Sequence, residues 1–419
     1  MPVPATLPAT AVFEFRATGN ADNGGIFDSA NPGGNGVDYT LQDAAQLAPT
    51  DLAMVAGTQT LTSATGGFTA AMENNWIRIS SGTHFTLGRR KLVTYVDTNT
   101  FTICSDATDG TNATAGVGNV GGAISIPKDG LLESAKPGNI IYIKGSDTFT
   151  FTELIAIAQA GTAQLPIRLI GYNTTRGDTP TGANRPTFAM ADYSFTSGLY
   201  WSVENIIFTT TSATAVTLSG VMGARNCKVT QSSGSDRNAI RIASAYTMVM
   251  DCEASSAAGD AINITGGYSS QRILWCYLHD SVSGITTPGT NCHAMIIMGN
   301  VIEACSASGI DGGRAYAHNI INNTIDTTVT GIGDVGASVT YGGWVIFNNI
   351  ISNMSTISID GYIEELSQII NYNDLYNNTA DYTPRDNDND VDPGYTSASD
   401  FSTGANVDDT GFGIRLGVG

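Results

Sequence analysis

The sequence predicts an all-β chain whose larger part is a parallel β-helix, a solenoid in which each coil adds strands to long sheets. A four-residue pattern returns at residues 204, 226, 251, 275, 299, 322, 348 and 372, so the spacings are 22, 25, 24, 24, 23, 26 and 24. Between these sites, short β-branched runs alternate with Gly, Ser, Thr and Asn turns. A nearly fixed period of about 24 residues without helical runs is typical of one β-helix coil.

One position of the repeat is occupied by only two residue types. Its members are Asn205, Cys227, Cys252, Cys276, Asn300, Asn323, Asn349 and Asn373. Stacked coils rise by about 4.8 Å, so a recurring inward position becomes a ladder along the axis. Asn in such a ladder can hydrogen-bond its neighbours, and Cys can serve as a small apolar filler. We therefore predict a structural ladder with eight members.

Four segments follow along the chain. Residues 1–50 are rich in Pro and Gly, and we expect an extended attachment segment with a strand over 11–17 and a short helix over 40–47. Residues 51–128 alternate in the manner of a small antiparallel β module. The β-helix spans 129–380 and begins with a short capping helix that ends at Pro137 and Gly138. Residues 381–419 form a polar tail that we expect to cap the last coil.

Composition excludes several classes of partner. The chain has 419 residues, with 19 basic and 38 acidic side chains and a net charge of −19. This charge disfavours nucleic acid and anionic membranes, which bind clustered Lys and Arg. The N-terminus lacks the basic and apolar regions of a signal peptide, and no run of eighteen apolar residues predicts a membrane span.

The six cysteines are predicted to stay reduced. Three of them lie in the ladder, where a separation of about 4.8 Å is wide for a disulfide and three stacked thiols cannot all pair. Reduced thiols indicate folding in a reducing cytoplasm. The alternative is that the cysteines bind a metal, but the Cys-x-x-Cys spacing and a His in register are missing.

Several segments resemble right-handed parallel β-helix virion proteins of tailed bacteriophages, within the wider pectate-lyase-like superfamily. Residues 135–145 resemble the first-coil signature of these proteins, although Asn139 stands where Asp is usual. The Asn column resembles their asparagine ladder, and Asp392-Pro393-Gly394 with Asp400-Phe401 resembles their closing cap. Residues 15–25 and 37–45 are similar to the opening of phage virion β-helix proteins.

The resemblance implies a function as well as a fold. It implies a structural virion protein, folded in the host cytoplasm and exposed on the particle surface as a capsid decoration (cement) protein or short spike. It also implies a homotrimer with helices side by side, attached to other virion proteins such as the major capsid protein. The fold hosts both enzymes and inert proteins, so catalysis has to be argued from residues.

Two acidic columns support an alternative hypothesis, a tailspike depolymerase that binds and hydrolyses host surface glycan. Glu303 and Asp326 share an outward position on adjacent coils, with His279 one coil earlier, and Asp311, Asp334 and Asp360 follow the second strand of three coils. Carboxylates on adjacent coils would lie about 5 Å apart and those on alternate coils about 9–10 Å apart, which brackets the glycosidase separations. Asp311-Gly312 and Asp360-Gly361 are also ordinary turn dipeptides, so the structural interpretation is favoured.

The tail contains a candidate metal site of a different kind. Asp386, Asp388, Asp390 and Asp392 have the alternate spacing of calcium ligands but lack the Gly and the distal Glu of an EF-hand loop. A solvated acidic cap is the favoured interpretation, with structural calcium as the alternative. We expect no cofactor.

Overall fold

The computed structural model describes residues 10–29, 36–125, 135–211, 213–220, 222–232, 237–266, 269–287, 292–313, 317–335, 343–361, 369–380 and 382–384. These residues form two compact units, the first within 1–150, 155–189 and 198–207 and the second within 151–154, 190–197 and 208–419. The tail aspartates Asp386, Asp388, Asp390 and Asp392, the tail cap and the predicted capping helix before residue 135 lie outside the described residues. Among the described residues, no helix has the length and apolarity needed to cross a membrane.

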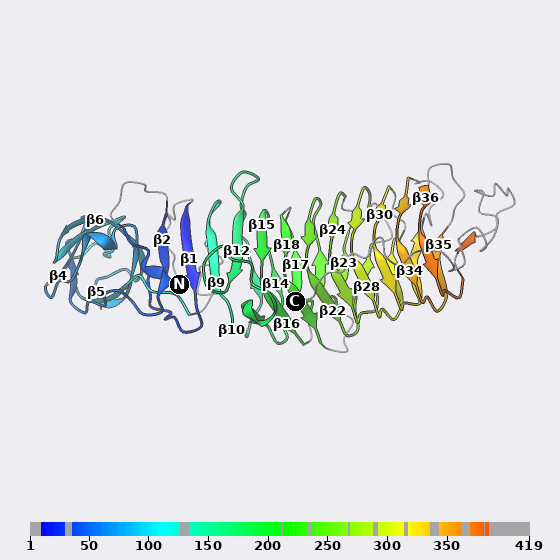
Figure 1. Cartoon of the computed structure of the whole chain (residues 1–419). Helices are drawn as coiled ribbons and strands as arrows, with labels where there is room; N and C mark the ends of the chain where they lie inside the picture. The colour runs from blue at the N-terminus through cyan, green and yellow to red at the C-terminus, as the bar shows by residue number, and fades with distance from the viewer. Residues whose placement is uncertain are drawn as a thin grey trace. The chain divides into compact units, whose positions relative to one another are not determined.

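The first unit contains a closed antiparallel barrel (Figure 1). Its strands follow the order β3-β4-β7-β6-β5-β8. Their bounds are β3 (Leu52–Met54), β4 (Thr60–Ser63), β5 (Trp76–Thr83), β6 (Gly88–Asp97), β7 (Thr100–Ile103) and β8 (Ala113–Val120), with a 3-10 turn η2 (Ala70–Met72). Leu61, Phe68 and Phe101 are buried inside it, with the Phe68 and Phe101 rings edge to face at 5.6 Å. Alternation of apolar and polar residues thus closes a small sheet on its own core.

The first unit also holds coil strands that come from both sides of the barrel in sequence. One sheet has the order β2-β1-β9-β12-β15, and β1 pairs in parallel with β9. The bounds are β1 (Ala11–Phe15), β2 (Ile26–Asp28), β9 (Ile140–Lys144), β10 (Thr148–Thr150), β11 (Ile155–Ala156), β12 (Ile167–Tyr172), η4 (Gly182–Asn184), β13 (Thr187–Ala189) and β15 (Trp201–Glu204). The strand that we expected within an extended N-terminal segment is therefore a member of a coil sheet.

The helix predicted over 40–47 is wrong. Only a 3-10 turn, η1 (Tyr39–Leu41), forms there, capped by the Asp38 carboxylate, which accepts a hydrogen bond from the Thr40 amide at 2.9 Å. Leu47 instead forms an antiparallel bridge with Val120 at the barrel edge. Pairing with the end of β8 satisfies the backbone N–H and C=O groups there, and this pairing overrides the local helical preference.

A buried carboxylate fixes β1 within the first unit. Glu14 has no solvent exposure, and its oxygens contact the Arg16 guanidinium at 2.9 Å and the Arg176 guanidinium at 2.7 Å. The Tyr172 hydroxyl also donates a hydrogen bond to Glu14. A buried charge is tolerated because it is paired on several sides.

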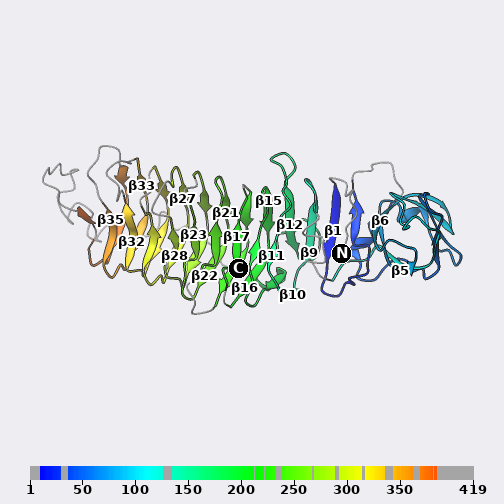
Figure 2. The ribbon, with the colours of Figure 1, turned by 180° about the vertical axis from the view of Figure 1, so that it is seen from behind.

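The second unit is a parallel β-helix with three strands in each coil (Figures 1 and 2). Its first sheet contains β18 (Gly223–Arg225), β21 (Met248–Met250), β24 (Arg272–Leu274), β27 (Ile296–Met298), β30 (Asn319–Ile321), β33 (Val345–Phe347) and β36 (Ile369–Asn371). Its second sheet contains β16 (Ile207–Thr210), β19 (Lys228–Gln231), β22 (Glu253–Ser256), β25 (Tyr277–His279), β28 (Val301–Glu303), β31 (Thr324–Asp326), β34 (Ile350–Ser352) and β37 (Asp374–Tyr376). Its third sheet contains β14 (Phe195–Thr196), β17 (Val216–Leu218), β20 (Ile240–Ile242), β23 (Ile262–Ile264), β26 (Ile285–Thr286), β29 (Ser308–Asp311), β32 (Thr330–Val335), β35 (Ile357–Gly361) and β38 (Tyr382–Pro384).

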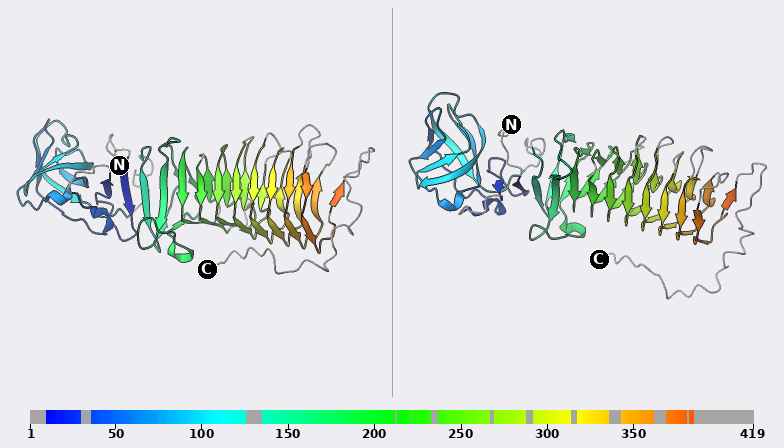
Figure 3. Two further views of the ribbon diagram at one scale, coloured as in Figure 1. Left: turned by 45° about the horizontal axis from the view of Figure 1, so that its top comes forward. Right: turned by 90° about the horizontal axis from the view of Figure 1, so that it is seen from above.

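The strands of successive coils lie side by side in register, as Figure 3 shows for the green to orange part of the chain. In the first sheet Ile273, Ile297, Ile320 and Ile346 form one fully buried inward column. The neighbours of each residue in its strand face outward, as the two-residue period of a strand requires. The predicted fold class, an all-β parallel β-helix with a small antiparallel module, is confirmed.

The ladder extends over seven of the eight predicted positions. From Asn300 to Asn373, each side-chain amide donates to the Oδ1 atom of the next Asn at 2.9–3.0 Å. Each Oδ1 also accepts the backbone N–H of the preceding ladder residue, beginning with Cys276 at 2.9 Å. Below them, the Cys227, Cys252 and Cys276 thiols donate to the carbonyls two residues earlier at 3.2–3.4 Å. None of the six cysteines is in a disulfide.

Asn205 is not part of this ladder, so the predicted alignment is wrong by one residue in its first coil. Asn205 has φ of 61°, like the turn residues Asn226 and Asp251, whereas Ile206 has the buried position that Cys227 holds one coil later. Asn tolerates the left-handed conformation that this turn requires. Its side chain donates to the Gly171 carbonyl at 3.0 Å.

Candidate functional site

Charged and titratable side chains gather on the outward face of the second sheet, over β19, β22, β25 and β28. The strand register forms two columns there. One is Lys228, Glu253 and Tyr277, and the other is Ser255, His279, Glu303 and Asp326. Because side chains on one face of neighbouring strands contact each other, the two columns form one surface array.

His279 links the two columns. Its Nε2 atom lies 3.4 Å from Glu253 Oε1 without a well-directed hydrogen bond, and its Nδ1 atom lies 2.8 Å from Asp280 Oδ2. The contact with Glu253 raises the pKa of His279 despite partial burial, and Asp280 adds to the effect. Lys228 Nζ completes the chain of charges at 2.6 Å from Glu253 Oε1. The contact with His279, opposed by burial and aided by Lys228, lowers the pKa of Glu253 to about 2.

Tyr277 joins the array to Glu303. The Tyr277 hydroxyl donates a hydrogen bond to Glu303 Oε1, and its ring stacks on the His279 ring with centroids 4.3 Å apart. Burial and the Glu303 carboxylate raise the pKa of Tyr277 to about 12. The phenol therefore stays protonated and acts as a donor at neutral pH.

The predicted pair of Glu303 and Asp326 does occupy directly opposed positions on β28 and β31. Asp326 accepts hydrogen bonds from Ser352 Oγ at 2.7 Å, Asn353 Nδ2 at 2.6 Å and Thr327 Oγ1 at 2.8 Å. These bonds lower its pKa although partial burial opposes them. An acid catalyst needs a raised pKa, so Asp326 is unsuited to that role.

The second predicted column contains two of its three members. Asp311 is opposite Gly333 rather than Asp334, because Ile310 pairs with Ile332, and Ile332 in turn pairs with Ile359. Asp334 is therefore one residue out of the column, and Asp311 and Asp360 stand two coils apart, a rise of about 9–10 Å. Asp311 Oδ1 accepts the Gly313 amide at 3.2 Å, as expected for a turn residue.

Residues that could hold a metal do not converge in the part of the chain that the structure describes. No group of three or more His, Cys, Asp or Glu side chains there has metal-binding geometry. The ladder cysteines are buried among apolar groups, and burial raises the pKa of the Cys252 thiol. A protonated thiol is a poor metal ligand.

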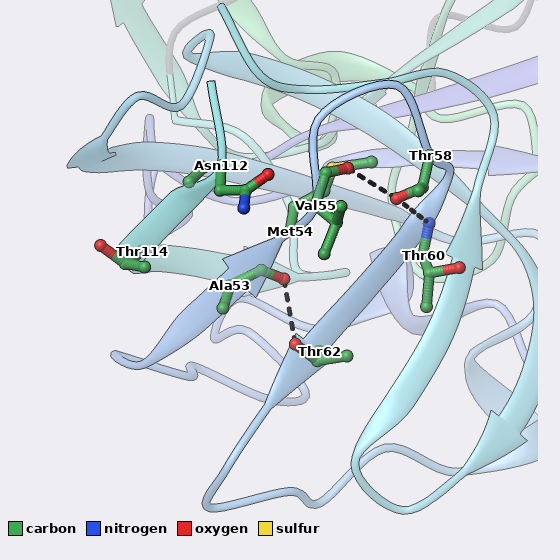
Figure 4. A pocket seen from close by; sticks show the side chains of 9 residues that line it. Ala53, Met54, Val55, Thr58, Thr60, Thr62, Asn112 and Thr114 are labelled. Carbon is green, nitrogen blue, oxygen red and sulfur yellow. Dashed lines mark hydrogen bonds between the residues drawn. The ribbon is translucent and has the colours of Figure 1, made fainter. Parts of the chain in front are cut away.

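A shallow hollow lies on the barrel of the first unit (Figure 4). Thr58, Thr60 and Thr62 line it together with Met54 and Val55, and the hydroxyls of Thr58 and Thr62 donate hydrogen bonds to nearby backbone carbonyls. Its lining carries no ionisable side chain. The hollow therefore offers no acid–base chemistry.

Sequence reasoning identified Glu303, Asp326 and His279 but not the roles of Glu253, Tyr277 and Asp280. The repeat period could have revealed the column of Lys228, Glu253 and Tyr277. These residues are 25 and 24 residues apart, like the ladder residues that precede each of them. The diagonal contacts between columns depend on side-chain direction, which periodicity does not specify.

Comparison with known proteins reveals similarity of structure only. No protein-family model matches the sequence, and no curated protein matches it. Among solved structures, an alginate lyase from Paenibacillus sp. str. FPU-7 is 14% identical, with 60% of this chain and 95% of that chain covered and a TM-score of 0.42. The pectate lyase Pel9A is 15% identical, with coverages of 64% and 77% and a TM-score of 0.41. The Dettilon tailspike protein is 15% identical, with coverages of 52% and 44% and a TM-score of 0.33.

Proposed function

We propose that this chain is a structural protein of a tailed-phage virion, a trimeric capsid decoration protein or short spike on the particle surface. The observation that carries the proposal is that the charged side chains on the outward face of the second sheet are already bonded to their neighbours. Glu253, His279 and Asp326 are each engaged by two or more neighbours, most of them on adjacent coils. Such contacts brace coil against coil, which suits a rigid projecting shaft.

The protonation of the array also supports a structural function. A general base near neutral pH needs a pKa near the working pH. In this array the pKa of Glu253 is lowered to about 2 and that of Tyr277 is raised to about 12, so neither group is suited to act as a base near neutral pH. The N-terminal and coil segments resemble phage virion β-helix proteins, and this resemblance supports a location on the phage particle.

Location on the particle tests the proposal. Purified virions of the source phage would be analysed by quantitative mass spectrometry and by electron microscopy with an antibody against this chain. Decoration predicts a copy number close to the number of capsid lattice positions, and a spike predicts a few trimers in each particle. Absence of the chain from purified particles would refute both forms.

A tailspike depolymerase is the second candidate, favoured by Asp311 and Asp360. Their separation of two coils is close to the spacing of an inverting carboxylate pair. Host surface polysaccharide incubated with the purified chain would release reducing ends if this candidate is correct. Asp311→Asn or Asp360→Asn should then abolish the release, and retention of full activity in both variants would exclude these carboxylates.

A further inference from the structure

One sheet of the second unit presents apolar side chains to the outside. In the first sheet, the outward position at the end of each strand is apolar on five successive coils, and the outward position two residues earlier is apolar on three of them. These residues, which we call the apolar stripe, are Met248, Met250, Leu274, Ile296, Met298, Ile321, Val345 and Phe347. All except Leu274 are partly exposed.

The other two sheets differ at the equivalent outward positions. On the second sheet, over β22 to β34, these positions carry acidic, hydroxyl and aromatic residues, with Val301 and Ile350 as the aliphatic exceptions. On the third sheet they carry Arg241, Asn263, Thr286 and Asp311 over four coils. The apolar residues are therefore concentrated on one face and do not reflect a general property of the coil surface.

Stacking within the sheet explains only part of this pattern. Cross-strand pairs of aliphatic residues contribute about 0.2–1 kcal/mol each, and Thr or Asn columns can stack as well. An apolar row that spans five coils and remains partly exposed on four of them marks an interaction surface. Four strand intervals of about 4.8 Å make the row about 19 Å long, which suits the core of an interface.

The charge of the molecule indicates what binds there. The chain has a net charge of −19, so two copies repel each other over most of their surfaces. Within the two outward columns from β21 to β33, the only ionisable residue is Arg272, and no carboxylate is present. This face therefore permits close approach of another strongly acidic chain.

We propose that the apolar stripe is the surface through which this chain binds a second copy of itself, with the coil axes side by side. A second copy carries the same stripe with the same coil spacing, so the two rows can interdigitate along their length. Exposed Trp275 and Tyr372, in the turns that follow β24 and β36, would flank the contact. The inference deepens the proposed function, since it assigns a face to the expected trimer.

A charge substitution in the full-length chain tests this surface. The double variant Met298→Lys/Ile321→Lys is compared with Ile350→Lys, which places the same charge on an exposed aliphatic position of the second sheet. Each Lys lowers the net negative charge, so greater overall repulsion cannot explain dissociation. Native mass spectrometry should show a multimer for the wild type and Ile350→Lys. The double variant should be monomeric, with association weakened at least about 100-fold and an unchanged circular dichroism spectrum.

Methionine oxidation provides a second readout. Dilute hydrogen peroxide should convert Met250 and Met298 to sulfoxides more slowly in the wild-type multimer than in a monomeric Ile321→Lys variant. A multimer that survives the double substitution would overturn the assigned face and leave the trimer intact. A monomeric wild type would overturn this inference and the trimer, while location on the virion is tested separately. A monomer whose stripe methionines resist oxidation would place the chain's own residues 385–419 on the stripe instead.

Discussion

At the scale of single residues, two histidines of the β-helix have opposite environments. His318 is fully buried between coils, and its ring lies 4.7 Å from the Trp344 ring. Neither ring nitrogen has a hydrogen-bond partner among the residues that the structure describes. Burial, with a contribution from His293, lowers its pKa to about 3. His279 instead lies on the surface beside Glu253 and Asp280, which raise its pKa. The two side chains should therefore respond to pH with opposite signs.

For His318, stability should decrease as the solution is acidified. Between its unfolded pKa near 6.5 and its folded pKa of about 3, the unfolded chain binds a proton that the folded chain excludes. The contribution is present above pH 6.5 and is lost by about 1 kcal/mol for each pH unit below it. Urea unfolding at several pH values should show a shallower slope in His318→Met, and an unchanged slope would contradict this assignment.

For His279, the stabilising contact should be lost as pH rises. Its folded pKa lies above its unfolded value, so its contribution is fully present below pH 6.5 and disappears as pH passes the folded pKa. Because the side chain is partly exposed, we expect His279→Gln to cost only about 0.5–1 kcal/mol at pH 5.5 and almost nothing at pH 9. Equal costs at both pH values would show that the ion pair with Glu253 is not the source.

At the scale of elements, the asparagine ladder connects each coil to the next. Asn323 accepts the Asn300 backbone amide at 3.0 Å and donates to the Ile297 carbonyl at 3.0 Å, both inside the protein. Replacement by Ala leaves these groups without partners, which should destabilise the fold by about 2–4 kcal/mol. Asn319→Ala is the matched control, since Asn319 lies at an outward position of the strand β30 and has an ordinary extended backbone. Similar losses in the two variants would show that the buried bonds have no special importance.

Packing between coils also depends on small residues in the third sheet. A Cβ atom at Gly331 would lie 2.4 Å from the Ser358 carbonyl oxygen, whereas one at Gly333, on the same strand, would meet nothing nearer than 3.4 Å. Gly331→Ala should therefore lower the free energy of unfolding by about 1–3 kcal/mol. Gly333→Ala should change it by less than about 0.5 kcal/mol. Thermal unfolding of the two variants would compare them, and the reverse ranking would contradict the assigned register.

At the scale of the whole molecule, the net charge of −19 opposes both compaction and self-association. An increase in NaCl from about 10 mM to about 100 mM shortens the screening length from about 30 Å to about 10 Å. We expect this increase to strengthen association through the uncharged stripe and to raise the melting temperature. Light scattering and calorimetry across the salt series would measure both effects. Weaker association at the higher salt would indicate that ion pairs, rather than apolar contact, hold the copies together.

The sequence alone determined the period, the all-β coil and the ladder from Cys227 to Asn373, because each is a local pattern repeated at a fixed interval. It could not place Asn205 or Asp334, since a shift of one residue in a turn or strand moves a side chain to another position without changing the composition. The opposed positions of Glu303 and Asp326 followed from spacing, but the partners of Asp326 on the next coil did not.

Tertiary structure decided the contacts that connect different columns and elements. The pairing of β1 with β9 brings together strands separated by the whole barrel, and the contacts of His279 with Glu253 cross diagonally between columns. The apolar stripe likewise required knowledge of which alternate positions face outward on which sheet. In the sequence its residues are indistinguishable from core residues. An apolar residue indicates burial, but it does not indicate whether the same chain or another chain covers it.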